Sequence, residues 1–253
     1  LFVIVPAVII SMAVLSLMGY LSSKAIIQTS AGNEMSQCLS VAMGSIEMSL
    51  SNNRMVAETM ARGVEAVQRQ AVKGEQTASD WDAAAYQEIL TSFVGSNPET
   101  FGGGIWFEPY QYRPEQRYFS PYCMRQNGAV TYVDNYSLGE GVYYTDQDWY
   151  TNAANTTQKS VWSAPYYDEF AQISMVTSSA PIYDETGRFL GVATADIDLT
   201  QMQQMVLSLD VVANGRAFLI PGYTLQTRTA RSSCPPTYWR MTTLHSPRLG
   251  GRF

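Results

Sequence analysis

The chain of 253 residues is long enough for one large domain or two small ones, and its 46% of apolar side chains is enough for a buried core. The formal net charge of −6 is unevenly distributed. All 22 acidic residues lie at or before Asp210, whereas the part up to Arg216 holds only 11 of the 16 basic residues. Because phosphate contacts need clusters of Lys and Arg, so acidic a body excludes nucleic acid as an expected partner.

Residues suited to metal binding or nucleophilic catalysis are few. The three cysteines, Cys38, Cys123 and Cys234, show no zinc-ligand spacing, and the single histidine, His245, lies in a basic C-terminal segment. We therefore expect no metal, no cofactor and no catalytic site of the Cys/His or Ser/His/Asp kind. The cysteines are interpreted as isolated buried thiols.

The first 23 residues contain no charged side chain, and Lys24 is the first. A helix of this length crosses the hydrocarbon core of a bilayer, which is roughly 30 Å thick. A secretory signal has a shorter apolar region of about 7–15 residues and a small-residue cleavage site, which is not evident here. We predict that residues 1–23 anchor the chain in an inner or plasma membrane and that the acidic remainder is extracytoplasmic.

Residues 24–72 contain no proline, and their apolar side chains recur at steps of three and four, which places them on one stripe of a helix. The stripe comprises Met35, Leu39, Ala42, Ile46, Leu50, Val56, Met60, Val64 and Val67. At 1.5 Å per residue such a helix is about 70 Å long, more than a compact domain usually contains. We predict a stalk that continues the membrane helix and pairs two copies as a homodimer. A long packing helix without a signalling role is the alternative.

A second, shorter helix and a group of strands follow the stalk. Asp80 is a candidate N-cap, and this helix is expected to end between Gly95 and Pro98. Short runs rich in aromatic and β-branched residues then alternate with turn signals. Asn127-Gly128 predicts a tight hairpin, because this pair tolerates the positive φ angles of such turns.

Residues 146–198 predict a helix, a strand and a hairpin in that order. The helix is expected over residues 146–155 with Asp146 or Thr145 as its cap, and the strand over SVWSAPYYD, residues 160–168. A turn from Asp184 to Gly187 joins two further strands. This order predicts an α+β fold with an antiparallel sheet and helices packed against it.

Three motifs in this region are DWYTNA, VWSAPYYDE and MVTSSAPIYDETGRFLGVATADIDL. In order and spacing they resemble the membrane-distal half of the extracytoplasmic double Cache sensor domain. This PAS-like ligand-binding module occurs in bacterial methyl-accepting chemotaxis proteins and sensor kinases. The resemblance covers about residues 24–220, and it implies a membrane-distal lobe over residues 73–210 and the start of a membrane-proximal lobe over 211–220.

The resemblance also implies a ligand-binding set. Members that bind amino acids line the pocket with a Trp-Tyr pair, a Tyr-x-Asp on the following strand and an Asp at the end of the last hairpin. The corresponding residues here are Trp149, Tyr150, Tyr166, Asp168 and Asp196.

Two positions depart from that pattern. Gln147 stands where those members have an Arg that grips the ligand carboxylate, and Asn152 stands where they have another Asp. Loss of the Arg removes a bidentate partner for a carboxylate, whereas aromatic faces and carboxylates together attract a cation. We therefore expect a small amine, or an amino-acid-like ligand held by other donors. The candidate donors are Arg113, Arg117 and Arg125, and Trp162 is expected in the core.

The C-terminal segment departs from the family pattern. LTQMQQMVLSLDV predicts a helix, and NGRAFLI predicts the first strand of a second lobe. Residues 221–253 then contain no acid, five arginines and little periodicity, which predicts a disordered tail. We interpret this composition break as a truncated or frame-shifted gene product, with a basic regulatory tail as the alternative.

These features favour the ligand-sensing region of a transmembrane chemoreceptor, without enzymatic activity, which passes a conformational shift down its stalk. A sensor region of a histidine kinase or of a cyclic-dinucleotide enzyme is an alternative. Two other classes stay open. One is an extracytoplasmic hydrolase that uses an Asp pair, either Asp168 with Asp196 or Asp146 with Asp148. The other is an adhesive membrane-tethered domain.

Overall fold

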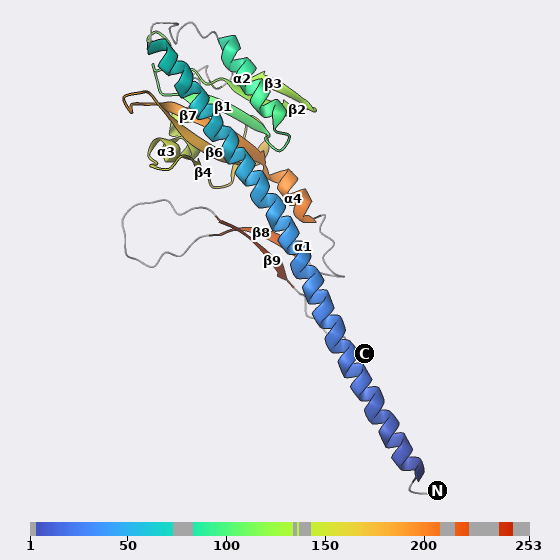
Figure 1. Ribbon diagram of the computed structural model, residues 1–253. Helices are drawn as coiled ribbons and strands as arrows, with labels where there is room; N and C mark the ends of the chain where they lie inside the picture. Colours follow the sequence, from blue (N-terminus) through green and yellow to red (C-terminus); the bar gives the residue numbers. More distant parts are fainter. Residues whose placement is uncertain are drawn as a thin grey trace.

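One continuous helix dominates the computed structural model, which describes residues 4–72, 83–133, 136, 143–207, 216–222 and 238–244. Helix α1 (Ile4–Val72) comprises 69 residues and joins the predicted membrane segment to the predicted stalk without a break. Its N-terminal part stands apart from the rest of the molecule, and its C-terminal part lies along a sheet (Figure 1). The predicted cap Asp80 lies outside the described residues.

The two parts of α1 differ in what surrounds them. The N-terminal part is long and apolar enough to cross a membrane, with a mean hydropathy of 2.2 over 18 residues that are wholly unburied. Further along, the predicted stripe is buried at Ala42, Ile46, Val56, Met60 and Val64, and the last four pack with residues of the sheet. The stripe is therefore confirmed over the part of α1 that packs on the domain. The side chains of Met35 and Leu39 lie outside the described part.

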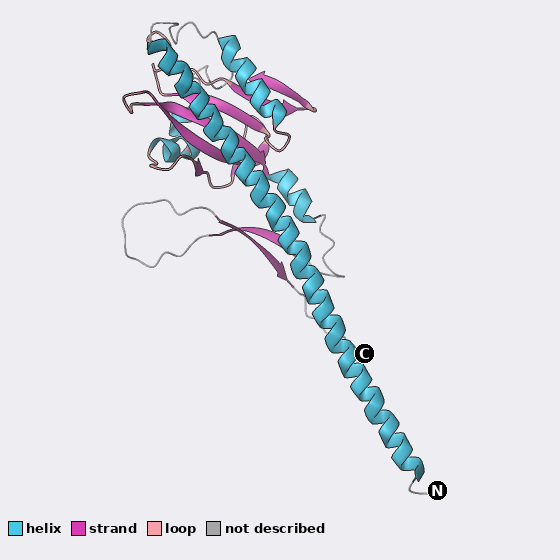
Figure 2. Ribbon diagram, in the orientation of Figure 1, coloured by secondary structure: helices cyan, strands magenta, loops and turns pink. Residues whose placement is uncertain are grey.

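Helix α2 (Ala83–Ser96) ends where the sequence predicts. Seven antiparallel strands follow it and form one sheet with helices packed against it (Figure 2), which confirms the α+β class. The strands are β1 (Gly102–Phe107), β2 (Tyr122–Gln126), β3 (Ala129–Val133), β4 (Val161–Trp162), β5 (Tyr166–Asp168), β6 (Ile173–Tyr183) and β7 (Phe189–Asp198). Their order across the sheet is β3-β2-β1-β7-β6-β4, and β5 pairs with another part of β6.

Two predicted hairpin turns are present. Asn127 and Gly128 adopt φ angles of 51° and 83°, as the tight turn between β2 and β3 requires. In the turn between β6 and β7, Asp184 accepts hydrogen bonds from Thr186 and Arg188, and Gly187 has a φ of 83°. Both turns are specified locally, so a short stretch of sequence is enough to predict them.

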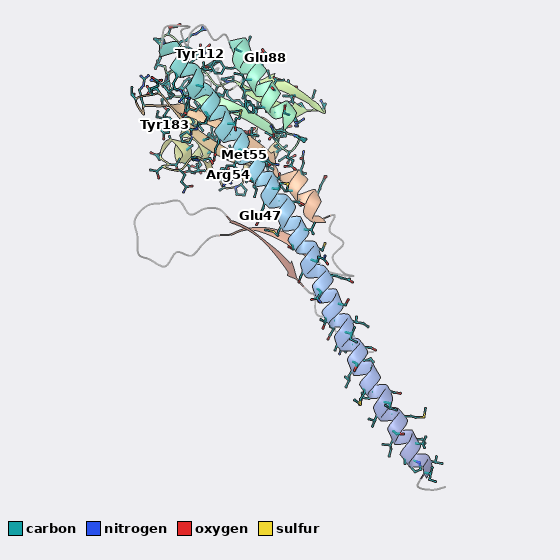
Figure 3. The ribbon with its side chains drawn as sticks, viewed as in Figure 1. Glu47, Arg54, Met55, Glu88, Tyr112 and Tyr183 are labelled. Carbon is teal, nitrogen blue, oxygen red and sulfur yellow. The ribbon has the colours of Figure 1, made fainter. Side chains whose placement is uncertain are left out.

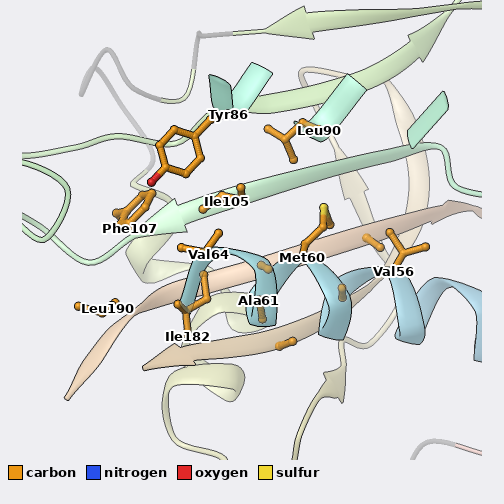
Figure 4. Close-up of a cluster of buried hydrophobic side chains, with 14 of the residues drawn as sticks. Val56, Met60, Ala61, Val64, Tyr86, Leu90, Ile105, Phe107, Ile182 and Leu190 are labelled. Atoms are coloured by element: carbon orange, nitrogen blue, oxygen red, sulfur yellow. The ribbon is translucent and has the colours of Figure 1, made fainter. Parts of the chain in front are cut away.

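Helices α1 and α2 cover one face of the sheet and share a core with it (Figure 4). Met60 and Val64 of α1 and Leu90 of α2 contact side chains such as Ile105 on β1. Nearly all residues of β6 and β7 are buried, because other elements cover the second face of the sheet as well. That second face carries the aromatic side chains described below.

Two predicted elements on the second face differ from expectation. Tyr144–Asp146 forms a short 3-10 helix, η3, and Gln147 then adopts an extended conformation, so α3 begins at Asp148 and ends at Ala154. Neither Thr145 nor Asp146 caps α3. The predicted strand over 160–168 is split into β4 and β5 around Pro165, since proline has no N–H to donate to a ladder.

The C-terminal part also differs from expectation. Helix α4 (Leu199–Leu207) and strand β8 (Arg216–Gly222) form where predicted. Strand β9 (Tyr238–Leu244) pairs antiparallel with β8, within the segment for which the sequence predicts disorder. Its aromatic and β-branched side chains favour an extended conformation despite the basic composition around them. The boundary predicted at residue 210 lies outside the described part.

Candidate ligand-binding site

A cavity of about 340 Å³ opens on the face of the sheet opposite α1 and α2. It is large enough for a small organic molecule, because ligand pockets measure roughly 300–1,000 Å³. Six aromatic residues, two acids and one amide line it: Tyr136, Tyr144, Gln147, Trp149, Tyr166, Tyr167, Asp168, Glu169 and Phe170. No Lys or Arg is among these lining residues.

Three short elements bring these side chains together. Gln147 and Trp149 lie at the start of α3, and Trp149 is buried against Trp106 of β1, with 4.8 Å between ring centroids. Strand β5 contributes Tyr166 and Asp168, and the turn after it contributes Phe170. Four of the six predicted site residues therefore line one cavity.

Asp168 is held in place by the turn that follows β5. Its Oδ1 accepts a hydrogen bond of 2.7 Å from the backbone N–H of Ala171. The hydroxyl of Tyr136, which also lines the cavity, donates to the same carboxylate at 3.3 Å. The carboxylate is thus fixed at the wall of the cavity with capacity for a further donor.

Asp196 lies behind the wall of the cavity instead of lining it. Only 3% of this residue is exposed, and its two oxygens accept hydrogen bonds from the hydroxyls of Tyr122 and Thr177 at 2.8 and 2.7 Å. Thr177 is in turn 2.7 Å from the hydroxyl of Tyr166, so a chain of hydrogen bonds joins Asp196 to the cavity. The predicted position of Asp196 is therefore near the site but one layer deeper.

Burial dominates the electrostatics of Asp196. It raises the pKa of this carboxyl to about 7, although the hydrogen bonds from Thr177 and Tyr122 act in the opposite direction. The negative charge of Asp168 raises the pKa further. Burial also raises the pKa of the Tyr166 hydroxyl, and the charge of Asp196 adds to this effect. Two carboxyl groups so close together favour a positive guest.

Two glycines of β1 make room for this arrangement. An added Cβ at Gly102 would collide with the hydroxyl of Tyr122, the group that donates to Asp196. At Gly104 an added Cβ would lie 2.7 Å from the indole of Trp106. Gly102 and Gly104 therefore leave room for the large side chains of Tyr122 and Trp106 on this face of the strand.

Tyr150 does not line the cavity, in contrast to the prediction. Its hydroxyl donates to Glu108 at 2.7 Å, and its ring contacts Tyr144 and Phe189. Consecutive residues on a helix are about 100° apart, so Trp149 and Tyr150 cannot both face one small cavity. Tyr150 belongs to the core that holds α3 on the sheet.

The arginines considered as carboxylate partners also lie outside the lining. Arg125 donates to the carbonyl oxygens of Thr100 and Asn97, which follow the end of α2. The guanidinium groups of Arg113 and Arg117 lie over the rings of Tyr112 and Tyr118. This placement leaves the expectation of an arginine that grips a ligand carboxylate without support.

The remaining predicted residues are peripheral. Asn152 does not line the cavity, and Trp162 is half-buried beside Ile46 and Val176 in a small cluster next to α1. Trp162 is therefore in a core, as expected. Among the cysteines, Cys123 is a buried free thiol and Cys38 a half-buried one, whereas Cys234 lies outside the described residues.

Several residues of the cavity lining and of the hydrogen-bond chain behind it were not identified from the sequence. Glu169 and Phe170 directly follow Asp168, so proximity along the chain was an available signal. Tyr136 and Thr177 lack such a signal, because they reach the site through the fold. Thr177 is opposite Asp196 in the register of β6 and β7, which only the assembled sheet reveals.

Comparison with known proteins agrees with this architecture. The family model for the first PDC sensor domain of methyl-accepting chemotaxis protein-like proteins matches residues 86–204. Two chemoreceptors are similar in sequence: McpC of Bacillus subtilis, 39% identical over 75 residues, and McpA of Pseudomonas putida, 25% identical over 191 residues. The alignments cover 30% and 73% of this chain but 11% and 29% of those receptors.

Solved structures show the same fold. The extracellular domain assigned to the histidine kinase soHK1S-Z6 matches with a TM-score of 0.63 at 22% identity, over 80% of this chain and 70% of that one. The sensory domain of the Campylobacter jejuni chemoreceptor Tlp3 with isoleucine bound matches with a TM-score of 0.52 at 17% identity, over 78% and 69%. Residues 86–204 therefore match the first PDC sensor domain of methyl-accepting chemotaxis protein-like proteins, and they share the Cache or PAS-like fold of these extracellular sensor domains.

Proposed function

We propose that this chain is the sensing part of a transmembrane chemoreceptor and that its cavity binds a small amine in the cationic form. The observation that carries the proposal is the lining, with six aromatic residues, Asp168 and Glu169 but no basic side chain among the residues that the structure describes. A cation over an aromatic face is stabilised by about 0.5–2 kcal/mol, depending on how far both are desolvated. The carboxylate of Asp168 adds a charge-assisted hydrogen bond.

Gln147 argues against a typical α-amino acid as the ligand. It lines the cavity where amino-acid-binding relatives are expected to have an Arg. A neutral amide lacks the charge and the paired donors that hold a carboxylate in a bidentate manner. An amino-acid-like ligand would therefore leave its carboxylate poorly matched, so we favour an amine without one.

Transmission to the stalk is supported by how closely the site approaches α1. Val176 and Ile197 immediately adjoin Thr177 and Asp196 along β6 and β7, and both belong to one buried cluster with Ile46 of α1. A change in the charge or hydrogen bonds of Asp196 would therefore occur next to the residues that pack against Ile46 of the stalk. Helix displacements of about 1–2 Å at such contacts are adequate for switching. The apolar N-terminal part of α1 would carry the shift through a membrane, with the sensor domain outside the cytoplasm.

A homodimer through the stalk is supported by apolar residues that α1 leaves uncovered. Val41, Met48 and Met55 are exposed by 67%, 64% and 58%, and they recur every seven residues. This heptad stripe lies on a different side of α1 from the buried Ile46 and Asn53. A seven-residue repeat of exposed apolar side chains is typical of a helix that pairs with a second copy.

A histidine kinase is the second candidate context, because the structural match with soHK1S-Z6 is to a domain from that class of protein. The sensing role proposed for the cavity is the same in either context. Neither Asp pair supports a hydrolase, since both oxygens of Asp196 accept internal hydrogen bonds, and Asp146 and Asp148 do not line the cavity.

A thermal-shift screen of the full chain in detergent tests the proposal. Alkylammonium ions, amino acids and small carboxylates are compared at equal concentration, and we expect stabilisation by the alkylammonium ions. Asp168→Asn should remove this stabilisation. Asp148→Asn is the matched control, because Asp148 is an exposed carboxylate on α3 outside the cavity lining. Stabilisation by carboxylates alone, or an equal loss in both variants, would contradict the assignment.

A further inference from the structure

A continuous chain of hydrogen bonds leads from the cavity into the centre of the sheet. It runs from the hydroxyl of Tyr166 to Thr177 and on to Asp196, with both distances at 2.7 Å, and Tyr122 completes the contacts of Asp196 from β2 at 2.8 Å. Thr177, Asp196 and Tyr122 are each 3% exposed or less. Only Tyr166, at the outer end of the chain, lines the cavity.

The direction of these hydrogen bonds depends on the charge of Asp196. An ionised carboxylate only accepts, so Thr177 must use its single proton toward Asp196, and Tyr166 must then donate to Thr177. A proton on Oδ1 of Asp196 reverses both links, because the carboxyl then donates to Thr177 and Thr177 donates to Tyr166. In this second arrangement Tyr166 accepts from Thr177, so its own hydroxyl proton is free to point elsewhere.

Among the residues that the structure describes, few charged or titratable groups face Asp196. They are Tyr122 from β2, Tyr136 after β3, and Tyr166 and Asp168 from β5. Burial raises the pKa of each of these three tyrosines, so their hydroxyls stay protonated at neutral pH. The charge that Asp196 experiences from this side therefore comes from Asp168 and from whatever occupies the cavity beside it.

We propose that cation binding in the cavity is linked to the release of a proton from Asp196, and that Thr177 is the positioning residue that carries this linkage to Tyr166. The inference rests on the proposed function, because it takes the ligand to be a cation. A positive charge beside Asp168 stabilises the ionised form of Asp196. The ionised form in turn makes Tyr166 point its hydroxyl proton away from the cation. The site would then report acidity as well as amine concentration.

The direction in which cation affinity changes with pH follows from the pKa of Asp196 in the protein without ligand. Its Asp196 has a pKa raised to about 7 by burial and by Asp168, so near neutral pH a large fraction of the carboxyl is protonated. A cation lowers that pKa, so binding tightens as the pH rises through this range. One pKa unit of coupling corresponds to a tenfold change in affinity. We therefore expect the affinity to rise by up to about tenfold between pH 5.5 and 8.5.

Isothermal titration calorimetry of the full chain in detergent tests this linkage. Ethylammonium and tetramethylammonium serve as probes, because the first titrates near pH 10, like a Lys side chain, and the second not at all. Titrations at pH 7 in phosphate and in MOPS, whose protonation enthalpies differ, count the protons released. We expect release of a fraction of one proton per bound cation, with affinity rising with pH as stated.

Three variants separate the linkage from folding. Asp196→Asn should bind without proton release and with an affinity independent of pH over this range. Thr177→Val should move the pH midpoint of binding upward, because it removes a hydrogen bond that stabilises ionised Asp196. Thr177→Ser keeps the hydroxyl and should restore the wild-type pH profile.

The outcomes distinguish this inference from the proposed function. Cation binding with no proton release, or a wild-type pH profile in Thr177→Val, would overturn the linkage and leave the cation site in place. Failure of both cations to bind at any pH would overturn the cation site and the linkage together. Proton release that persists in Asp196→Asn would assign the linkage to another group and overturn the role given to Asp196.

Discussion

Single residues decide the chemistry of this sensor domain more than its overall composition does. Asp168 contributes a carboxylate to the cavity, whereas Asp196 is enclosed and has a pKa raised to about 7. Trp149 and Tyr150 are neighbours in sequence, yet only Trp149 lines the cavity. The type of a residue and its place in the sequence therefore do not show whether it lines the cavity; its burial and orientation do.

The buried carboxyl should make the stability of the empty protein depend on pH. The pKa of Asp196 is higher in the folded state than the ordinary value of 3.8, so the folded state binds more protons between about pH 4 and 7. The contribution of Asp196 to the free energy of unfolding should therefore fall as the pH rises through this range. Thermal unfolding of the wild type and of Asp196→Asn measures it. The variant should be relatively more stable at pH 8 than at pH 4, and an unchanged difference would argue against the raised pKa.

Gly102 should be intolerant of a side chain. Gly102→Ala places a Cβ against the Tyr122 hydroxyl and should lower the free energy of unfolding by about 1–3 kcal/mol, as overpacking in a core does. Gly63→Ala is the matched control, because nothing lies within 4 Å of the Cβ added at this position of α1. It should be neutral or stabilise by up to about 1 kcal/mol. Equal effects in chemical denaturation would contradict the close contact at Gly102.

At the scale of helices and strands, local patterns were predictable and long-range placement was not. The apolar stripe of α1 and the Asn127-Gly128 turn each depend on neighbours in sequence, and both are present. The start of α3 was placed two residues early, because the 3-10 turn before it could not be recognised from residue types. The hydrogen bond from Thr177 to Asp196 depends on strand register, which is a property of the whole sheet.

The heptad stripe of Val41, Met48 and Met55 predicts contact between two stalks. With the three cysteines replaced by Ser, Met48→Cys should form a disulfide-linked dimer under mild oxidation. Figure 3 shows Met55 of this stripe on α1 and Glu88 on α2. Glu88→Cys is the control, since Glu88 is exposed on a helix that contributes nothing to the stripe. Non-reducing electrophoresis should show the dimer for Met48→Cys alone, and comparable cross-linking of both would count against a stalk dimer.

At the scale of the whole molecule, the core shared with α1 and the aromatic cluster beside the cavity lie on opposite faces of one sheet. The cluster of Ile46, Val176, Ile197 and Met202 joins the ends of β6 and β7 to the stalk. A ligand that alters the network at Thr177 and Asp196 therefore acts next to the contact that holds α1. The proposed sensor is thus physically continuous with the apolar N-terminal part of α1.

The stalk contact should be costly to weaken. Ile46 is fully buried, so Ile46→Ala should lower the free energy of unfolding by about 2–5 kcal/mol through loss of packing. Chemical denaturation with Met43→Ala as a less buried control measures the difference. Because Ile46 lies outside the cavity lining, cation affinity of the folded variant should stay close to that of the wild type. A large loss of affinity would mean that α1 shapes the cavity directly.

The central claim is that the cavity beside Trp149 binds a cation, and calorimetric titration of ethylammonium into three forms of the full chain tests it most directly. Trp149→Leu removes a lining ring and should weaken binding by about 2-fold to 30-fold, the range that corresponds to 0.5–2 kcal/mol. Tyr150→Phe removes a neighbouring hydroxyl outside the cavity and should leave the dissociation constant within about twofold of the wild type. Binding unaffected by Trp149→Leu but lost in Tyr150→Phe would contradict the account.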